Sequence, residues 1–238
     1  MSIFLSGCML SGKLPSTLMH VVIIPLLKCK SKDPADVNNY RPIAIATDLS
    51  KVLEQVLLSR LARYLWTADS QFGFKQAHGT EMAIFVLRQR VDFYRNQDTP
   101  VYMCFLDAKK AFARVNHWTL AKKLLDRNVP LHIVKIFIFW REQEFMVWWG
   151  NSLSMKFHCA NGIRQGGQLS PLLYNVYTDD LNHHLQATGV GCFVGGAWVN
   201  SLLCGWYGVT CTHGNCSSDT LGGMSRICWT SWHRIQHN

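Results

Sequence analysis

A short apolar run that ends in an aspartate constrains the fold of this chain most. Residues 101–106 are almost all apolar and include β-branched and aromatic members, which is typical of a strand buried on both faces. Asp107 follows directly, so its carboxylate is expected at the exit of that strand. A carboxylate held there by rigid backbone suits a hard cation such as Mg²⁺ that also contacts phosphates. The alternative is an aspartate that only ends the strand and caps the next turn.

Helical and extended patterns are mixed along the rest of the chain, which predicts an α+β fold. Strands are expected at Val21–Leu27 and in a hairpin around the Gly150-Asn151 turn. The predicted helices are one from an N-cap at Asp48 to Leu65, with the apolar stripe Val52, Val56, Leu57, Leu61 and Leu65; one capped by Thr80, with the core stripe Ile84, Leu87, Val91 and Tyr94; Trp118–Asp126; and Ile133–Trp140.

The segment Asn161–Pro171 is the most specific stretch of the sequence. It reads Asn-Gly-Ile-Arg-Gln-Gly-Gly-Gln-Leu-Ser-Pro. Its glycines allow the backbone to approach a bound molecule closely. Ser170 followed by Pro171 is typical of a cap and a first-turn proline, so a helix is expected to begin there.

Three segments together resemble motifs of reverse transcriptases, in particular those of non-LTR (LINE-type) retrotransposons. Phe105–Phe112, continued by Arg-Val-Asn-His at 114–117, is similar to motif A, and Asn161–Pro171 is similar to motif B. Tyr-Arg-Pro-Ile at 40–43, followed by Leu-Ser-Lys-Val-Leu-Glu at 49–54, is similar to the first fingers motif. The resemblance extends from about Leu14 to Leu202.

The resemblance implies a right-hand polymerase plan with fingers at residues 20–95 and an incomplete palm, an antiparallel sheet with packed helices, at 96–203. Residues 1–19 are then a remnant helix of an upstream region, and residues 204–238 are a non-homologous, disordered tail. The implied activity is RNA-directed DNA synthesis with Mg²⁺, on an RNA template, a DNA primer and deoxynucleoside triphosphates.

The resemblance also implies the site residues. Asp107 is the expected metal ligand and catalytic carboxylate, and Arg41 and Lys75 are the expected triphosphate contacts. Phe112 lies where the family has an aromatic steric gate against ribonucleotides, and Gln165 and Gly166 are expected beside the nucleotide. For Phe112 the alternative is a core phenylalanine, and for Arg41 and Lys75 it is a loop cation without such a role.

The family needs further carboxylates from a Tyr-x-Asp-Asp hairpin, and Tyr177-Thr-Asp-Asp180 is an apparent match. However, Leu173, Val176, Leu181 and their neighbours repeat at helical spacing from Ser170, with no turn residues around the two aspartates. We therefore expect Asp179 and Asp180 to lie on a helix and not to bind metal.

The true hairpin is expected after the strands Cys192–Val194 and Ala197–Val199, but the sequence loses its pattern at Leu203. Codons for residue 204 onward can be read one base out of frame as Tyr-Ala-Asp-Gly-Met-Val-Leu-Leu-Ala-Pro-Thr, which resembles the missing motif. The hypothesis is a slip of the reading frame near Leu203 and a catalytically inactive product. A zinc site is the alternative for this tail, with Cys204, Cys211, His213, Cys216, Cys228 and His233 as possible ligands, but no ligand pair has the usual spacing.

Composition agrees with a nucleic-acid partner. Lys and Arg number 24 against 15 Asp and Glu, a formal charge of +9, which favours polyanions. The nine cysteines follow no disulfide framework, so an intracellular protein, nuclear or cytoplasmic and without a membrane span, is expected. The alternative function is a non-catalytic nucleic-acid-binding remnant or an unstable translation product; oligomeric state is unknown from the sequence.

Overall fold

The structure is a computed structural model that describes residues 2–108, 110–187, 192–194, 197–199, 201–203 and 206–211. For residues 2, 102–107, 185 and 186 and from 192 onward it describes the backbone only. The chain divides into two compact units, each made of two separate stretches. Unit 1 comprises Met1–Trp66 and Lys110–Tyr177, and unit 2 comprises Thr67–Lys109 and Thr178–Asn238. These units are discontinuous in sequence, unlike the predicted blocks 20–95 and 96–203, because the chain leaves unit 1 and later returns to it.

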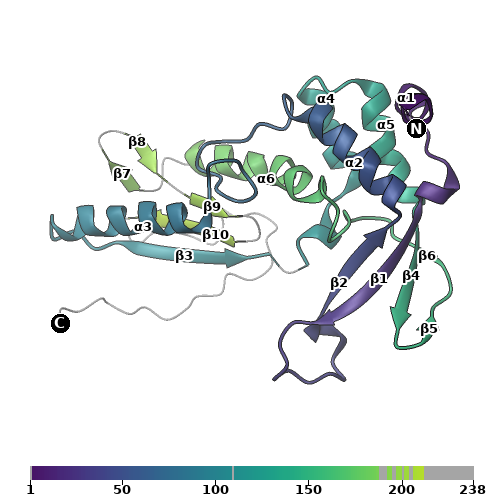
Figure 1. The fold of residues 1–238 in the computed structure, drawn as a ribbon. Coiled ribbons are helices and arrows are strands. Elements are labelled where there is room, and N and C mark those ends of the chain that lie inside the picture. Colours follow the sequence, from purple (N-terminus) through teal and green to yellow (C-terminus); the bar gives the residue numbers. More distant parts are fainter. Residues whose placement is uncertain are drawn as a thin grey trace. The chain divides into compact units, whose positions relative to one another are not determined.

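Unit 1 is a five-stranded sheet with helices at one end (Figure 1). Its strand order is β2-β1-β4-β5, and β6 also pairs with β4. β1 is antiparallel to β2 and parallel to β4, with His20 opposite Glu144. The elements are α1 (Ser2–Ser11), β1 (His20–Leu27), β2 (Tyr40–Ala46), α2 (Asp48–Leu61), α4 (His117–Asp126), α5 (Leu131–Phe139), β4 (Glu144–Trp149), β5 (Ser152–Leu153), β6 (Phe157–His158) and the first part of α6 (Ser170–Ala187).

The predicted strands and helices of unit 1 are confirmed, with corrections to α2. The N-cap is Thr47 and not Asp48, because the Thr47 hydroxyl accepts the Ser50 N–H, and the helix ends at Leu61. Its buried stripe is Ser50, Leu53, Glu54, Leu57 and Leu61, whereas Val52 is 43% exposed. In the first half of the helix the buried face thus includes Leu53 in place of the predicted Val52. Glu54 also lies on this buried face.

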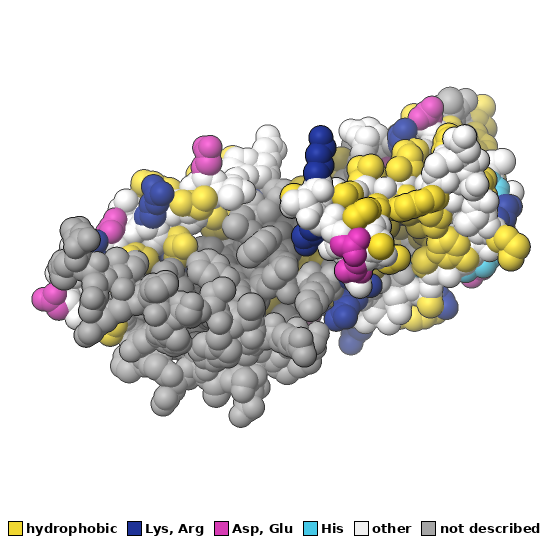
Figure 2. All heavy atoms as spheres, turned by 90° about the horizontal axis from the view of Figure 1, so that it is seen from below, with side chains coloured by type: hydrophobic (Ala, Val, Ile, Leu, Met, Phe, Trp, Pro, Cys, Tyr) yellow, Lys and Arg dark blue, Asp and Glu magenta, His cyan; other side chains and the backbone are white. Residues whose placement is uncertain are grey.

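The core of unit 1 lies between the helices. Leu57, Leu124, Val134 and Ile136 are fully buried. The strands β1, β2 and β4 extend past the helices, so their far ends are covered less (Figure 1). Trp148, Trp149 and Leu153 are therefore each more than half exposed, and hydrophobic side chains lie beside charged ones in the view from that end (Figure 2).

Unit 2 is built around a three-stranded sheet in the order β3-β10-β9, together with a two-stranded sheet of β7 and β8. α3 runs beside this sheet and contacts β9 and β7 (Figure 1). The elements are α3 (Thr80–Arg95), β3 (Tyr102–Asp107), β7 (Cys192–Val194), β8 (Ala197–Val199), β9 (Ser201–Leu203) and β10 (Trp206–Cys211), with the remainder of α6. The α+β prediction is confirmed.

The structure differs from three expectations for unit 2. Residues 206–211, within the predicted disordered tail 204–238, form β10, whose backbone pairs with β3 on one side and β9 on the other. The rest of that tail lies outside the described residues. The N-cap of α3 is Gly79 and not Thr80, and Ile84 of the predicted core stripe is 44% exposed. Within the described part of the chain, no helix has the length and apolar character that crossing a membrane requires.

Candidate functional site

We call the turn at residues 161–169 the motif B turn. Its first end is fixed by the end of motif A and the residues that follow it. Ile163 donates its backbone N–H to the Phe112 carbonyl at 2.9 Å, and the His117 Nε2 hydrogen-bonds the Gly162 carbonyl. Gly162 has φ +105°, and a Cβ there would lie 3.1 Å from the backbone of Ala113. Glycine is therefore required at 162 for the two segments to touch.

The middle of the motif B turn lies against strand β2. The Ala44 N–H donates to the Gln165 carbonyl at 2.7 Å. Gly166 has φ +117°, and a Cβ on it would lie 2.9 Å from the Ala44 carbonyl oxygen. A side chain at 166 would push the turn off the strand. Arg41 lies three residues earlier on β2, and its side chain is exposed.

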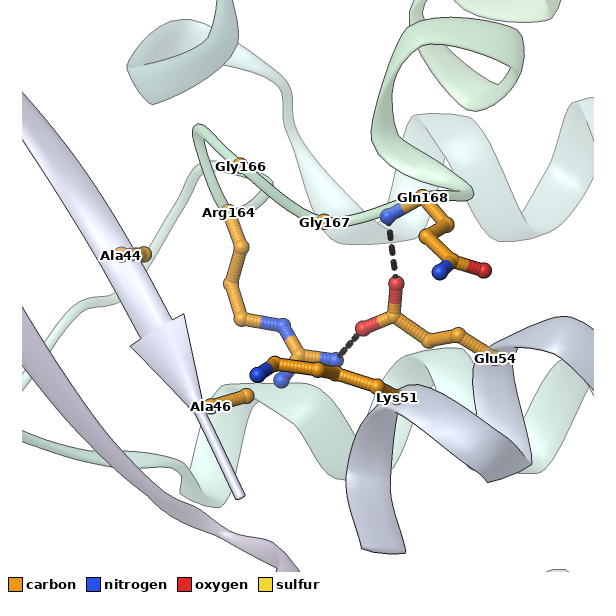
Figure 3. Close-up of a pocket in the computed structure, with 8 residues that line it drawn as sticks. All are labelled: Ala44, Ala46, Lys51, Glu54, Arg164, Gly166, Gly167 and Gln168. Atoms are coloured by element: carbon orange, nitrogen blue, oxygen red, sulfur yellow. Dashed lines mark hydrogen bonds and ion pairs between the residues drawn. The ribbon is translucent and has the colours of Figure 1, made fainter. Parts of the chain in front are cut away.

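The far end of the turn is bound to Glu54 of α2 (Figure 3). One carboxylate oxygen accepts the Gln168 N–H at 2.7 Å, and the other forms an ion pair with the Arg164 guanidinium. Arg164 also donates to the Ser50 hydroxyl at 3.1 Å, and its guanidinium carbon lies 5.0 Å from the centre of the Trp140 ring. Burial lowers the pKa of Arg164, and the neighbouring Glu54 opposes that shift.

A cavity of about 80 Å³ lies between this turn, β2 and α2 (Figure 3). It has room for a few water molecules and is too small for a nucleotide. A nucleotide at this turn would therefore contact its exposed side, where Gly166 lies. The cavity is lined by Ala44, Ala46, Lys51, Glu54, Arg164, Gly166, Gly167 and Gln168.

Phe112 begins a short 3-10 turn, Phe112–Arg114, in unit 1. Its ring is half-buried and packs on Tyr174, with the ring centres 5.2 Å apart and the planes inclined by 34°. The structure thus brings Arg41, Phe112, Gln165 and Gly166, all predicted site residues, into one unit. Their roles toward a nucleotide stay predictions.

Lys75 belongs to unit 2 and ties down its own loop. Its ammonium donates to the carbonyls of Thr67 and Ala68 at 3.1 and 3.2 Å, and to the Asp69 carboxylate at 3.1 Å. An ammonium has three donors, so these contacts engage all of them. Binding a triphosphate would require Lys75 to give up some of these bonds.

Asp107 is the last residue of β3, as predicted, and the strand register places Trp206 of β10 directly opposite it. The described strands β9 and β10 read Ser-Leu-Leu and Trp-Tyr-Gly-Val-Thr-Cys, with no acidic residue in either. Neither strand thus adds a carboxylate, the kind of ligand that Mg²⁺ prefers, to that of Asp107.

The apparent Tyr-x-Asp-Asp match lies within helix α6, as predicted. Asp179 is 1% exposed and accepts the backbone N–H of Ala68 at 3.0 Å. This aspartate therefore has a structural partner in the loop that Lys75 also holds.

Other predicted ligands fall outside what the structure describes. The side chains of Asp107 and of the candidate zinc ligands are among them. Among the side chains that are described, no three His, Cys, Asp or Glu residues lie close enough together to hold a metal ion.

Sequence reasoning missed Glu54, Arg164 and His117, which position the motif B turn. For Glu54 a signal existed, because it lies one turn from Ser50 and three residues before Leu57, on the buried face of α2. A glutamate on an apolar face needs a partner, and the arginine inside the glycine-rich turn was the available one. His117 had no comparable signal, because its partner is a backbone carbonyl.

Comparison with known proteins agrees with the motifs. Residues 29–195 match the family model described as reverse transcriptase (RNA-dependent DNA polymerase). The chain is 33% identical over 185 residues to the RNA-directed DNA polymerase from mobile element jockey of Drosophila funebris, covering 75% of this chain and 20% of that protein. It is 29% identical over 195 residues to the Pol polyprotein from the type-1 retrotransposable element R2 of Popillia japonica, covering 79% of this chain and 26% of that protein.

Among solved structures, apo telomerase from Candida tropicalis, truncated from its C-terminal domain, has a similar fold. The TM-score is 0.53 with 14% identity, over 88% of this chain and 46% of telomerase. This likeness supports the polymerase fold predicted from the sequence. The chain spans only about a fifth to a quarter of the two retrotransposon proteins. It belongs to the reverse transcriptase (RNA-dependent DNA polymerase) family, and within that family it resembles the enzymes of non-LTR retrotransposons.

Proposed function

We propose that this chain is a reverse transcriptase domain that binds nucleic acid and nucleoside triphosphates but does not polymerise. In this proposal residues 20–95 are the fingers and residues 96–203 the incomplete palm. The observation that carries it is the pairing of Asp107 with Trp206 across β3 and β10. Two divalent ions a few ångströms apart repel each other and need several carboxylates to hold them. The described strands β3, β9 and β10 contain one carboxylate, that of Asp107.

Charge supports the binding half of the proposal. The formal net charge is +9, and Lys28, Lys30 and Lys32 are exposed on the loop between β1 and β2. Arg41 and Lys110 are also exposed in unit 1. The proposed partners are an RNA template, a DNA primer and deoxynucleoside triphosphates, inside the cell, in the nucleus or cytoplasm.

The alternative is RNA-directed DNA synthesis, which the names of the relatives favour. In the family this reaction uses divalent metal, so it would need cation ligands other than those of β9 and β10. Primer extension and nucleic-acid binding, measured on the same purified protein, separate the two functions. A radiolabelled oligo(dT) primer on poly(rA), with dTTP and either Mg²⁺ or Mn²⁺, reports extension, and fluorescence anisotropy of a labelled RNA–DNA hybrid reports binding.

We expect binding that weakens steeply as salt rises, because phosphate contacts release counterions, together with no extended primer. Extension above the level of an Asp107→Ala control would contradict the non-catalytic proposal. Affinity for the hybrid that does not change between low and physiological salt would contradict the basic surface.

A further inference from the structure

We infer that Glu54 and Arg164 are positioning residues for the part of the motif B turn that contacts the nucleotide. The inference rests on the proposed nucleotide binding at Gln165 and Gly166. It concerns residues that contact no ligand themselves, since Glu54 is 2% and Arg164 4% exposed.

A single carboxylate holds both ends of a short arch (Figure 3). Arg164 stands at the start of the arch and Gln168 at its end, and each bonds to a different oxygen of Glu54. Leu169 donates a longer bond, 3.4 Å, to the oxygen that also accepts from Gln168. One carboxylate thus links the Arg164 side chain at the start of the arch to the backbone at its end.

The residues between these ends have little freedom. A Cβ on Gly167 would lie 2.8 Å from the Ser170 hydroxyl and 3.2 Å from Glu54, so the arch lies directly on the glutamate. The Gln165 carbonyl is bound to Ala44 on β2. With both ends held by α2 and the middle held by β2, the exposed Gly166 backbone has one position relative to Arg41.

Stability alone does not account for this arrangement. Taking two charges out of water is costly, and replacing a buried ion pair by apolar residues of similar size is often neutral or stabilising. An apolar pair, however, offers no acceptor to the Gln168 N–H, so it would not define the end of the arch. The ion pair therefore fixes the conformation of the turn, because Glu54 accepts the Gln168 N–H as well as binding Arg164.

The test compares nucleotide affinity with stability in matched variants. Glu54→Leu with Arg164→Leu removes the pair and keeps an apolar fill, and Glu54→Gln keeps a carbonyl oxygen but loses the charge. Glu144→Gln is the control, because Glu144 also pairs with a cation, Lys156 at 2.8 Å, but at the surface of the same unit. The probe is methylanthraniloyl-dTTP in the presence of poly(rA) and oligo(dT), with thermal unfolding followed by circular dichroism.

We expect the double variant to unfold within a few degrees of the wild type and to bind the nucleotide about tenfold more weakly, while Glu144→Gln binds normally. A double variant that is folded and binds as tightly as the wild type would overturn the inference. If the double variant does not fold, Glu54→Gln decides through the amide resonances of Gly166 and Gly167. Shifts at these amides are expected, and unchanged amides contradict the positioning role. If the wild type binds no nucleotide, the proposed function fails, and the same resonances still test the inference.

Discussion

Trp206 pairs with Asp107 across the antiparallel strands β10 and β3, so a tryptophan lies opposite the aspartate that the sequence predicts as the metal ligand. The out-of-frame reading places its aspartate at the same position, 206. β10 thus pairs with β3 along its backbone although its residues include no carboxylate.

The first prediction follows from that pairing. Trp206→Asp places two carboxylates opposite each other, so Mn²⁺ should bind at least about tenfold more tightly than to the wild type. Isothermal titration calorimetry with Mn²⁺ measures this affinity. Trp206→Asn is the control, because asparagine has the size of aspartate but no charge. Adding Asp107→Asn to Trp206→Asp should abolish the gain in affinity. An equal affinity in Trp206→Asp and Trp206→Asn would show that position 206 is not beside Asp107.

The second prediction concerns the two aspartates of α6. Asp179→Ala should lower the free energy of unfolding by about 1–3 kcal/mol, because the Ala68 N–H loses its buried acceptor. Asp180→Ala, at an exposed position, should cost less. Urea unfolding measures both. Neither change should alter primer extension, which we expect to be absent throughout; extension that the double change abolishes would assign these aspartates to catalysis instead.

Local pattern was enough to predict most elements of the fold. Apolar spacing located β1, β3, α4 and α5, and glycine with asparagine located the turn after β4. The predicted apolar stripe of α2 includes Val52, whereas the structure buries its neighbour Leu53. Both residues are apolar, so only tertiary packing distinguishes them. β10 could not be predicted at all. Its residues have no strand period, and it is held by pairing to β3, about a hundred residues earlier.

Part of the candidate site can also be predicted from local sequence pattern. Gln165, Gly166, Phe112 and Arg41 belong to motifs that can be identified in the sequence. Lys75 was expected to be available to a triphosphate, and only the structure shows that three oxygen atoms of its own loop surround it. Hydrogen bonds to the oxygen atoms of an irregular loop follow no periodic pattern, so the sequence does not predict them.

The third prediction tests the close approach of the motif B turn to β2. Gly166→Ala should destabilise the protein by about 1–3 kcal/mol, since the added Cβ meets the Ala44 carbonyl at 2.9 Å and φ is +117°. Gly7→Ala is the matched control. Beyond the neighbouring backbone of helix α1, no atom of the described residues lies within 4 Å of its Cβ position, so alanine there should stabilise the helix by roughly 0.5–1 kcal/mol. Destabilisation of equal size in both variants would contradict the contact with Ala44.

The fourth prediction concerns pH. Burial lowers the pKa of His117 below its ordinary value of 6.5; the hydrogen bond to Gly162 opposes this shift, and Arg141 adds to it. Well above pH 6.5 the residue is neutral in both the folded and the unfolded state. As pH falls below 6.5 the unfolded chain takes up the proton first, so the free energy of unfolding should decrease until the folded-state pKa is reached.

Urea unfolding of the wild type and of His117→Gln, between pH 7.5 and 5, measures that dependence. Glutamine can still donate to the Gly162 carbonyl but does not titrate, so its curve should be flatter in this range. Parallel curves for the two proteins would show that His117 contributes nothing to the pH dependence.

The parallel pairing of β1 with β4 sets an order of events during synthesis. His20 lies opposite Glu144, so the hairpin of β1 and β2 leaves the ribosome long before the strand that completes its sheet. At about 5–20 residues per second the wait is on the order of ten seconds. During that time β1 presents an unpaired apolar edge, which is a site for binding by chaperones or for misassembly between nascent chains.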